Sequence, residues 1–262
     1  MEGTHAFEQW LWGVTLFLKA GLVLLVVYRK NNRVLPFFFS YLVLNFLQSV
    51  LLYETYRIWG LDSPVSLRVA WGTQGLVTLA RALAVAEICH AILARHRGIW
   101  QLAWRLLAGT AIFVTVYSWA VSRGRWELVI LSLDRALEMA MVSAIAILFV
   151  FARHYQVTVT PVIRLLSIGF FQYSCFRVIN DTILERWLHH YASLWNLLDV
   201  LAFLGSLLLW MWALRQTLPA TAPAPELLPE NDYRVLSPAI NARLKALNEQ
   251  LIHFWRTEGE NT

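Results

Sequence analysis

The sequence predicts an all-α polytopic membrane protein: a seven-transmembrane-helix bundle with its N-terminus outside, its C-terminus in the cytoplasm and a C-terminal amphipathic helix. Hydrophobic residues make up 58% of the 262 residues and charged residues 15%, against about 45–50% and about 25% in soluble proteins. The apolar residues gather in seven long runs, and Lys and Arg are unequally distributed between the breaks. This composition excludes a disordered chain, a coiled-coil rod, a small disulfide scaffold and almost any water-soluble enzyme.

The seven apolar runs lie at about residues 9–28, 34–56, 67–94, 101–121, 127–152, 165–185 and 193–214. Each is long enough for a helix to cross a hydrocarbon core of about 30 Å. The runs are continuous rather than alternating, which favours helices over the strands of a barrel. Glu2 and Glu8 precede the first run without any Lys or Arg. The first run therefore lacks the basic start of a signal peptide, and we expect it to be retained.

The orientation follows from the basic residues between the runs. One set of loops holds nine Lys or Arg residues, namely Arg29, Lys30, Arg33, Arg95, Arg97, Arg105, Arg153, Arg164 and Arg215. The opposite set holds five, namely Arg57, Arg68, Arg123, Arg125 and Arg186. Because cytoplasmic loops carry the excess of positive charge, the N-terminus is expected outside and the C-terminus inside.

Polar residues inside the runs are the candidate functional residues. A charge at the centre of a membrane helix costs about 2.5–3.5 kcal/mol, so such residues normally face the bundle interior and are paired. The expected intramembrane polar network or ligand pocket comprises Lys19, Arg81, Asp134, Arg135, Glu138, Arg177, Asn180, Asp181, Asn196 and Asp199. Glu87 and His90 are expected in the inner half of the membrane. The fourth run has no ionisable residue well inside its span, so we expect it to be the most lipid-exposed.

Residues three, four or seven apart share one face of a helix. Such pairs are Gln74 and Arg81, Asp134 and Glu138, Arg177 and Asp181, and Asn196 and Asp199. Four helices can thus direct polar groups at one region in the outer half of the membrane. Two interpretations remain open: buried interhelical contacts that fix the packing, or a cavity open to the outside that binds a ligand or ions. Lys19 is either snorkelling or buried with an acid, and we favour burial.

No catalytic site, metal site or cofactor is predicted. The chain has no His-Glu-x-x-His, no paired-cysteine spacing, no Gly-rich phosphate loop and no Gly-x-Ser-x-Gly, the patterns that carry such chemistry. We therefore do not expect an enzyme. His189 and His190, with Glu185, lie in the last outer loop, where adjacent histidines are more often solvated than metal-bound.

The composition changes after residue 215. We expect residues 1–215 to form the seven-helix transmembrane domain, 216–237 a Pro/Ala-rich linker, and 238–257 a cytoplasmic amphipathic helix. Ser237 and Pro238 read as an N-cap and first helical position. The apolar face of this helix, its expected interaction face, comprises Ile240, Leu244, Leu247, Leu251 and Phe254. It rests on the membrane surface or the protein itself, or it docks a second copy or a cytoplasmic protein partner.

Two resemblances carry limited implications. Asp199-Val200-Leu201-Ala202-Phe203-Leu204-Gly205 is similar to the seventh-helix pattern of microbial rhodopsins, which also share the seven-helix outline. The retinal-binding lysine of that family corresponds to Phe203, so retinal cannot attach there. The basic stretch from Arg29 to Arg33 with the following Leu35-Pro36-Phe37-Phe38-Phe39-Ser40-Tyr41, and Arg135 with Glu138, resemble a group of uncharacterised bacterial seven-helix integral membrane proteins, which implies no activity.

These observations predict a multi-pass protein of the cell membrane, namely a bacterial inner membrane, with the lipid bilayer as a partner and no nucleic acid. Three functions remain open. The first is a sensor or receptor-like protein with an outer-half polar pocket. The second is a small transporter or ion-coupled carrier, against which the odd helix number counts. The third is a structural or assembly subunit of a membrane complex, whose ionic cluster only holds helices together.

Overall fold

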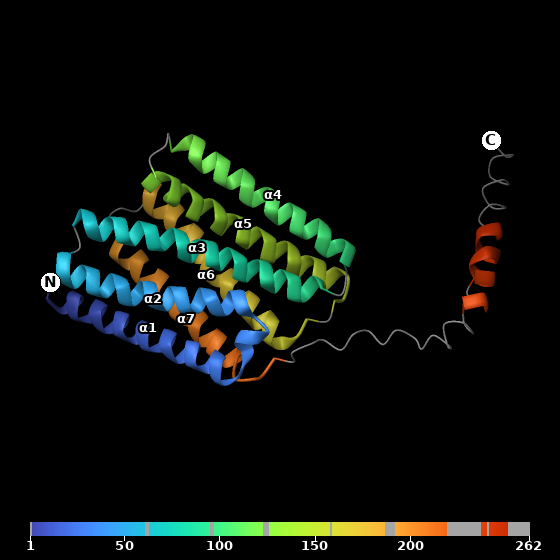
Figure 1. The fold of residues 1–262 in the computed structure, drawn as a ribbon, viewed down its shortest axis with the longest axis horizontal. Coiled ribbons are helices and arrows are strands. Elements are labelled where there is room, and N and C mark those ends of the chain that lie inside the picture. The colour runs from blue at the N-terminus through green and yellow to red at the C-terminus, as the bar shows by residue number, and fades with distance from the viewer. Residues whose placement is uncertain are drawn as a thin grey trace. The chain divides into compact units, whose positions relative to one another are not determined.

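The computed structural model describes residues 2–60, 63–94, 97–122, 126–157, 159–186, 192–218, 237–239 and 241–250. Within these ranges it describes no side chains for residues 2–9, 97, 127, 181–186 and 192–196. The described part is all-α, without a strand. Its long helices are α1 (Glu2–Tyr28), α2 (Pro36–Trp59), α3 (Pro64–Leu93), α4 (Arg97–Val121), α5 (Trp126–His154), α6 (Pro161–Arg186) and α7 (Ala192–Ala213), and η1 (Asn31–Arg33) is a short 3-10 helix (Figure 1).

Six of these helices, α1 to α6, are long and apolar enough to cross a membrane, judged on the residues that the structure describes. The described apolar part of α7, Leu197–Ala213, is shorter. The prediction of an all-α multi-pass membrane protein is confirmed in this form. Helices α3 and α6 begin earlier than their apolar runs, because proline occupies their first turn, where its missing N–H costs nothing. Proline also starts α2, which begins two residues after the start of its run.

The chain divides into two compact units, Met1–Leu218 and Pro219–Thr262. In the second unit, residues 237–239 and 241–250 are helical. Ile240, Leu251 and Phe254 of the predicted interaction face lie outside the described residues, whereas Leu244 and Leu247 are exposed. The amphipathic role of this segment stays a prediction.

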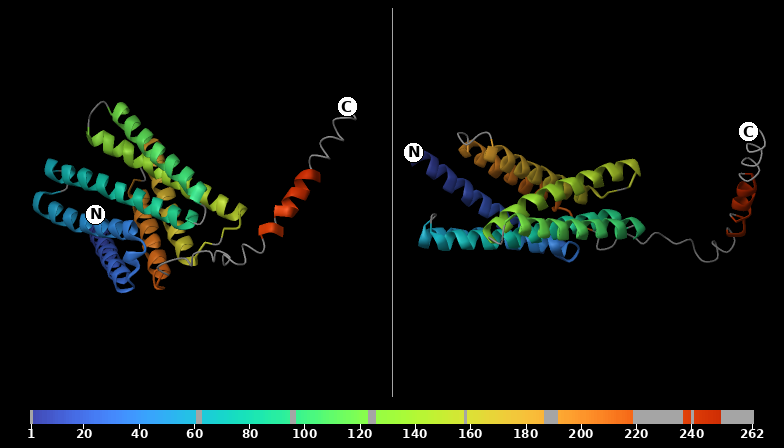
Figure 2. Two further views of the ribbon diagram at one scale, coloured as in Figure 1. Left: turned by 45° about the vertical axis from the view of Figure 1, so that its right-hand side comes forward. Right: turned by 90° about the horizontal axis from the view of Figure 1, so that it is seen from above.

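Within the first unit, α3 is the central helix. It packs against α2, α4, α5 and α6, and it is the most deeply buried of the six candidate spans. Helices α1, α2, α3, α6 and α7 are joined by successive contacts into a ring. In Figure 1 and in the right-hand view of Figure 2, α6 and α7 lie on one side of the layer that α2, α3 and α4 form.

Helix α4 is peripheral. Among the described helices it contacts only α3 and α5, and its Gly98–Val121 stretch is 6% buried, the least of the six spans. This agrees with the expectation that the run without deep charges faces lipid.

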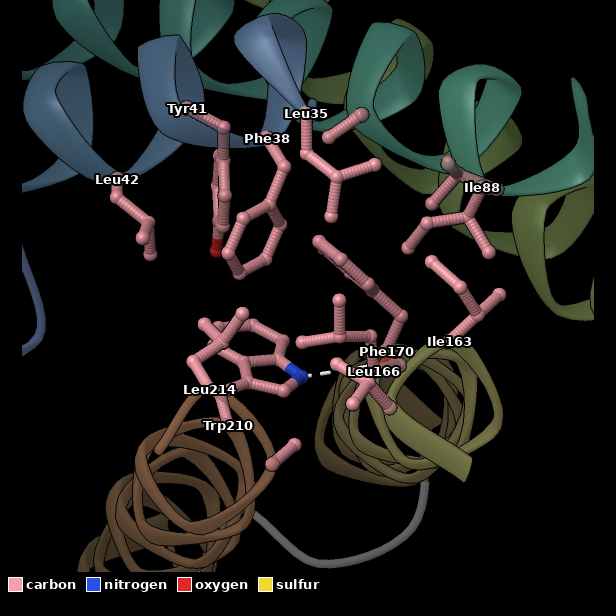
Figure 3. Close-up of a cluster of buried hydrophobic side chains, with 14 of the residues drawn as sticks. Leu35, Phe38, Tyr41, Leu42, Ile88, Ile163, Leu166, Phe170, Trp210 and Leu214 are labelled. Atoms are coloured by element: carbon pink, nitrogen blue, oxygen red, sulfur yellow. Dashed lines mark hydrogen bonds between the residues drawn. The ribbon is translucent and has the colours of Figure 1, made fainter. Parts of the chain in front are cut away.

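Aromatic side chains fill the interior between α2, α6 and α7 (Figure 3). Phe38 and Tyr41 of α2 meet Phe170 of α6 and Trp210 of α7, with ring centroids 5.6–6.1 Å apart. Phe170 and Trp210 also pack on each other, with ring centroids 4.6 Å apart. The Trp210 indole donates a hydrogen bond to the carbonyl of Leu166, 3.2 Å away. Such edge-on pairs contribute beyond the apolar area that they bury. They hold α6 and α7 against α2 without any charge.

Glu87 has a structural role in this packing. Helix α2 begins after Leu35, which offers no side-chain cap, so its first backbone N–H groups need other acceptors. The Glu87 carboxylate of α3 accepts from the N–H groups of Phe37 and Phe38, at 3.1 and 2.8 Å. A negative charge at a helix N-terminus also interacts favourably with the helix dipole. Glu87 thus ties the start of α2 to α3.

Asn31, which is fully buried, holds the end of the first unit. Its amide nitrogen donates to the carbonyl of Gln216 at 3.2 Å, and its amide oxygen accepts from the backbone N–H of Leu218 at 2.9 Å. The connection between α1 and α2 therefore fixes the chain where it leaves α7.

Candidate intramembrane ionic site

Three helices supply the charged residues of the site from single faces. On α3, Gln74, Thr78 and Arg81 follow one another at intervals of four and three residues, and so line one face. Asp134 and Glu138 are one turn apart on α5, and Tyr173 and Arg177 are one turn apart on α6. Contacts of α3 with α5 and α6, and of α5 with α6, bring these three faces together.

The ionic network consists of Arg81, Asp134, Glu138 and Arg177. Arg177 Nη2 lies 2.6 Å from Asp134 Oδ2, and Arg81 Nη2 lies 3.5 Å from Asp134 Oδ1. Arg81 Nη1 pairs with Glu138 Oε1, which also lies 3.9 Å from Arg177 Nε. Two arginines thus balance two carboxylates, and the network as a whole carries no net formal charge.

Neutral polar groups complete the surroundings of Asp134. The Thr78 hydroxyl donates to Asp134 Oδ1, and Gln74 Nε2 donates to Asp134 Oδ2 at 3.3 Å. Asp134 therefore has four donor residues, and a carboxylate so surrounded is well matched even in a low dielectric. On α6, the Tyr173 hydroxyl accepts from Arg177 Nη1 at 3.3 Å, and the Arg81 guanidinium lies 5.3 Å from the centre of the Tyr173 ring.

The four side chains of the network differ in accessibility. Arg81 and Glu138 are each 1% exposed and Asp134 is 6% exposed, whereas Arg177 is 22% exposed. Arg177 is thus the most accessible side chain of the network. Asp134 lies about 12 Å along α5 from its first residue, and Arg177 about 13 Å along α6 from its last, at 1.5 Å per residue.

Two buried oxygens beside the network lack hydrogen-bond partners among the residues that the structure describes. They are Glu138 Oε2 and the hydroxyl of Tyr41. Tyr41 is 1% exposed, and its hydroxyl lies near Arg81, Glu138 and Arg177. Buried polar atoms are normally hydrogen-bonded. The network therefore has hydrogen-bonding capacity that the described protein groups do not use.

A chain of hydrogen bonds leads from the network towards the α2 side of α3. Gln74, which donates to Asp134, accepts from Gln48 Nε2 at 3.2 Å, and the same amide nitrogen lies 3.3 Å from the Thr73 hydroxyl. Gln48 and Thr73 line an apolar groove of about 420 Å³ between α2 and α3. The polar network thus reaches from α6 through α5 and α3 to α2.

Lys19 does not join the four-residue network. Its ammonium donates to the Ser49 hydroxyl of α2 at 2.6 Å and lies 4.9 Å from the centre of the Phe203 ring of α7. Lys19 is half-buried, and its ammonium is hydrogen-bonded to a neighbouring helix instead of reaching towards an interface. The ion pairs seen between described residues do not include Lys19, so the expected acidic partner is not found among them.

The remaining predicted residues differ in burial and in the helix on which they lie. Arg135 and Asp199 are half-buried on α5 and α7. Asn180 is half-buried one turn beyond Arg177, and its buried Oδ1 has no hydrogen-bond partner in the described part of the chain. The side chains of Asp181 and Asn196 lie outside the described residues. His90 is exposed and packs on Trp100 of α4, with ring centroids 4.6 Å apart.

Four members of the site were not predicted. Thr78 and Tyr173 were detectable from their spacing, since Thr78 lies between Gln74 and Arg81 on the same face and Tyr173 is one turn before Arg177. Tyr41 and Gln48 gave no such signal, because their place depends on how α2 packs against α3 and α6.

Among the described residues, no group of three or more His, Cys, Asp or Glu side chains could hold a metal ion. Comparisons of this chain with protein-family models, with curated proteins and with solved structures found no match.

Proposed function

We propose that this protein is a receptor-like sensor of the membrane in which the ionic network is a ligand-responsive contact between α6 and the α3–α5 pair. In this proposal α7 completes seven crossings, the N-terminus lies outside, and residues 238–257 form a cytoplasmic amphipathic helix. The membrane is the inner membrane of a bacterium. The orientation rests on the excess of Lys and Arg at the connections that follow the odd-numbered helices.

The observation that carries the proposal is the unequal matching of the two carboxylates. Asp134 has four donor residues, which is what a purely structural contact needs. Glu138 is equally buried, yet its Oε2 has no hydrogen-bond partner in the described part of the chain. A buried ion pair contributes to stability only when its remaining lone pairs are satisfied. The incomplete matching at Glu138 and Tyr41 favours a site that exchanges partners.

Arg177 is the residue at which a ligand replaces a partner within the protein. It alone is partly exposed, and it connects α6 to both acids of α5. A polar ligand that competes for its guanidinium removes contacts between α6 and α5 while leaving Arg81 with Asp134 and Glu138. A ligand shifts a conformational equilibrium only by its difference in affinity for the two states, and here that difference arises at Arg177.

Accessibility of the site to water tests the proposal. Cys89 and Cys175 are first replaced by alanine. Single cysteines are then introduced by Arg177→Cys and by Asn180→Cys, and the latter leaves the ion pairs in place. Ile179→Cys is the matched control, since Ile179 is an exposed apolar residue of the same helix and is expected to face lipid.

We expect a charged, membrane-impermeant thiol reagent added outside intact cells to label Asn180→Cys and Arg177→Cys, and to leave Ile179→Cys unlabelled. Labelling only from the inside would contradict the proposed orientation. No labelling of either site variant from any side, with protein levels equal to the parent, would show that the network is sealed and only structural.

A further inference from the structure

Lys19 is a cation at the middle of the membrane segment of α1. It is the tenth of the 19 residues of the span Trp10–Tyr28, so it lies about 13 Å along the helix from either end. Its ammonium carries three N–H donors. One donates to Ser49, and the ring of Phe203 lies beneath the charge. No carboxylate among the described residues lies within ion-pair distance of Lys19.

An unpaired charge at this depth is costly, and neither contact removes the cost. Ser49 is a neutral partner whose own hydroxyl also donates to the carbonyl of Asn45 at 3.1 Å. A cation over an aromatic face gains up to about 2 kcal/mol when desolvated, which is less than the cost of an isolated buried ion. The site thus lacks one negative charge.

We propose that Lys19 and Ser49 form a binding site for the carboxylate of a hydrophobic monocarboxylic acid. The carboxylate supplies the missing single negative charge and accepts from a free N–H of Lys19. The Ser49 hydroxyl exchanges the Asn45 carbonyl for the second carboxylate oxygen. Charge-assisted hydrogen bonds of this kind are about twice as strong as neutral ones.

The depth of the site in the membrane restricts which ligands can reach it. About 13 Å of helix on each side of Lys19 separates it from the interfaces, where phospholipid headgroups lie, so a headgroup phosphate does not reach it. Phe203, together with the aromatic pair of Trp12 and Tyr53 that joins α1 to α2, offers apolar surface for a hydrocarbon body. A slender acid that partitions into the bilayer meets both requirements.

This site is separate from the ionic network, since it involves α1, α2 and α7 rather than α3, α5 and α6. Its test therefore stands apart from that of the proposed function. If the carboxylate site fails, labelling at Asn180 is unaffected, and a sealed ionic network leaves binding at Lys19 possible.

The experiment measures the thermal unfolding temperature of the full chain in an uncharged detergent, with decanoate as the probe. Decan-1-ol, which has the same chain without a charge, reports non-specific partitioning. Ligand binding to the folded state raises the unfolding temperature in proportion to RT ln(1 + [L]/Kd). The variants are Lys19→Met, Lys19→Arg and Ser49→Ala, and Lys30→Met removes one lysine charge elsewhere.

We expect decanoate, but not decan-1-ol, to raise the unfolding temperature of the parent and of Lys30→Met. Lys19→Met should weaken decanoate binding about 10- to 100-fold and Ser49→Ala about fivefold, from the usual value of charged and neutral hydrogen bonds. Lys19→Arg should retain binding. Equal effects of decanoate and decan-1-ol, or unchanged decanoate binding in both Lys19→Met and Ser49→Ala, would overturn the proposal.

Discussion

Replacing Asp134 by asparagine removes the charge that both arginines of the ionic network share. Asparagine keeps an oxygen that accepts from Thr78 or Gln74, and its volume is nearly unchanged. Arg81 and Arg177 are then left with Glu138 alone, so the buried network gains one uncompensated positive charge. The change therefore tests electrostatics in the buried site rather than packing.

The magnitude depends on how dry the site is. Breaking a buried ion pair by removing one partner costs about 3–5 kcal/mol, whereas polar contacts between membrane helices average below about 1 kcal/mol. Asp134 is 6% exposed and its two arginine contacts are at 2.6 and 3.5 Å. The first estimate therefore applies, and we expect Asp134→Asn to lower the free energy of unfolding by about 3 kcal/mol.

A double-mutant cycle separates this charge effect from a general loss of structure. Arg177→Gln alone leaves one negative charge in excess, but Asp134→Asn together with Arg177→Gln restores neutrality around the Arg81–Glu138 pair. The double variant should be more stable than the sum of the two single effects predicts, by about 2 kcal/mol. Reversible denaturant unfolding in mixed micelles, followed by tryptophan fluorescence, measures all four proteins.

Glu54→Gln is the matched control, because it neutralises an exposed carboxylate of α2 and should change stability by less than about 0.5 kcal/mol. The reasoning is refuted if Asp134→Asn costs less than about 1 kcal/mol and combines additively with Arg177→Gln. That result would mean that water already screens the charges of the network.

Three further changes test the packing and the isolated charges. Gly169→Ala should destabilise the fold by about 1–3 kcal/mol, because the added Cβ would overlap the buried indole of Trp210. Gly205→Ala, whose added Cβ meets its nearest neighbour at 3.4 Å, should be neutral or stabilising by up to about 1 kcal/mol. Thermal unfolding compares the two. Glu87→Gln should cost about 1 kcal/mol through the weakened start of α2, seen as faster amide exchange in the first turn of that helix. Lys19→Met should raise stability by about 1–2 kcal/mol, because the insertion cost of the charge exceeds one hydrogen bond; a less stable variant in denaturant unfolding would contradict this.

Helical periodicity was sufficient to predict the core of the ionic network. Asp134 and Glu138 share a face at four residues apart, and the cost of charge in lipid favoured pairing of the acids with Arg81, Arg135 and Arg177. Arg81, Asp134, Glu138 and Arg177 are four of the ten residues predicted for an intramembrane polar network, and the structure places these four in contact.

The partners of Lys19 and Glu87 could not be predicted in the same way. Spacing within one helix says nothing about the register between two helices, which sets Lys19 beside Ser49 rather than beside an acid. The sequence did contain an indication for Glu87, since a helix that begins at Pro36 after Leu35 lacks a cap of its own and needs an acceptor from elsewhere. Identifying that acceptor required the packing of α2 against α3.

The α2–α3 hairpin is fastened at three levels along its length. The Ser66 hydroxyl donates to the Gly60 carbonyl at 2.6 Å beside the connecting turn, Gln48 meets Thr73 in the middle, and Glu87 holds the first turn of α2 at the far end. Contacts at three heights oppose both sliding and tilting of α2 against α3. The α2–α3 hairpin is therefore a suitable fixed reference for distance measurements with paired spin labels. One label on the hairpin and one on α6 would measure any displacement of α6.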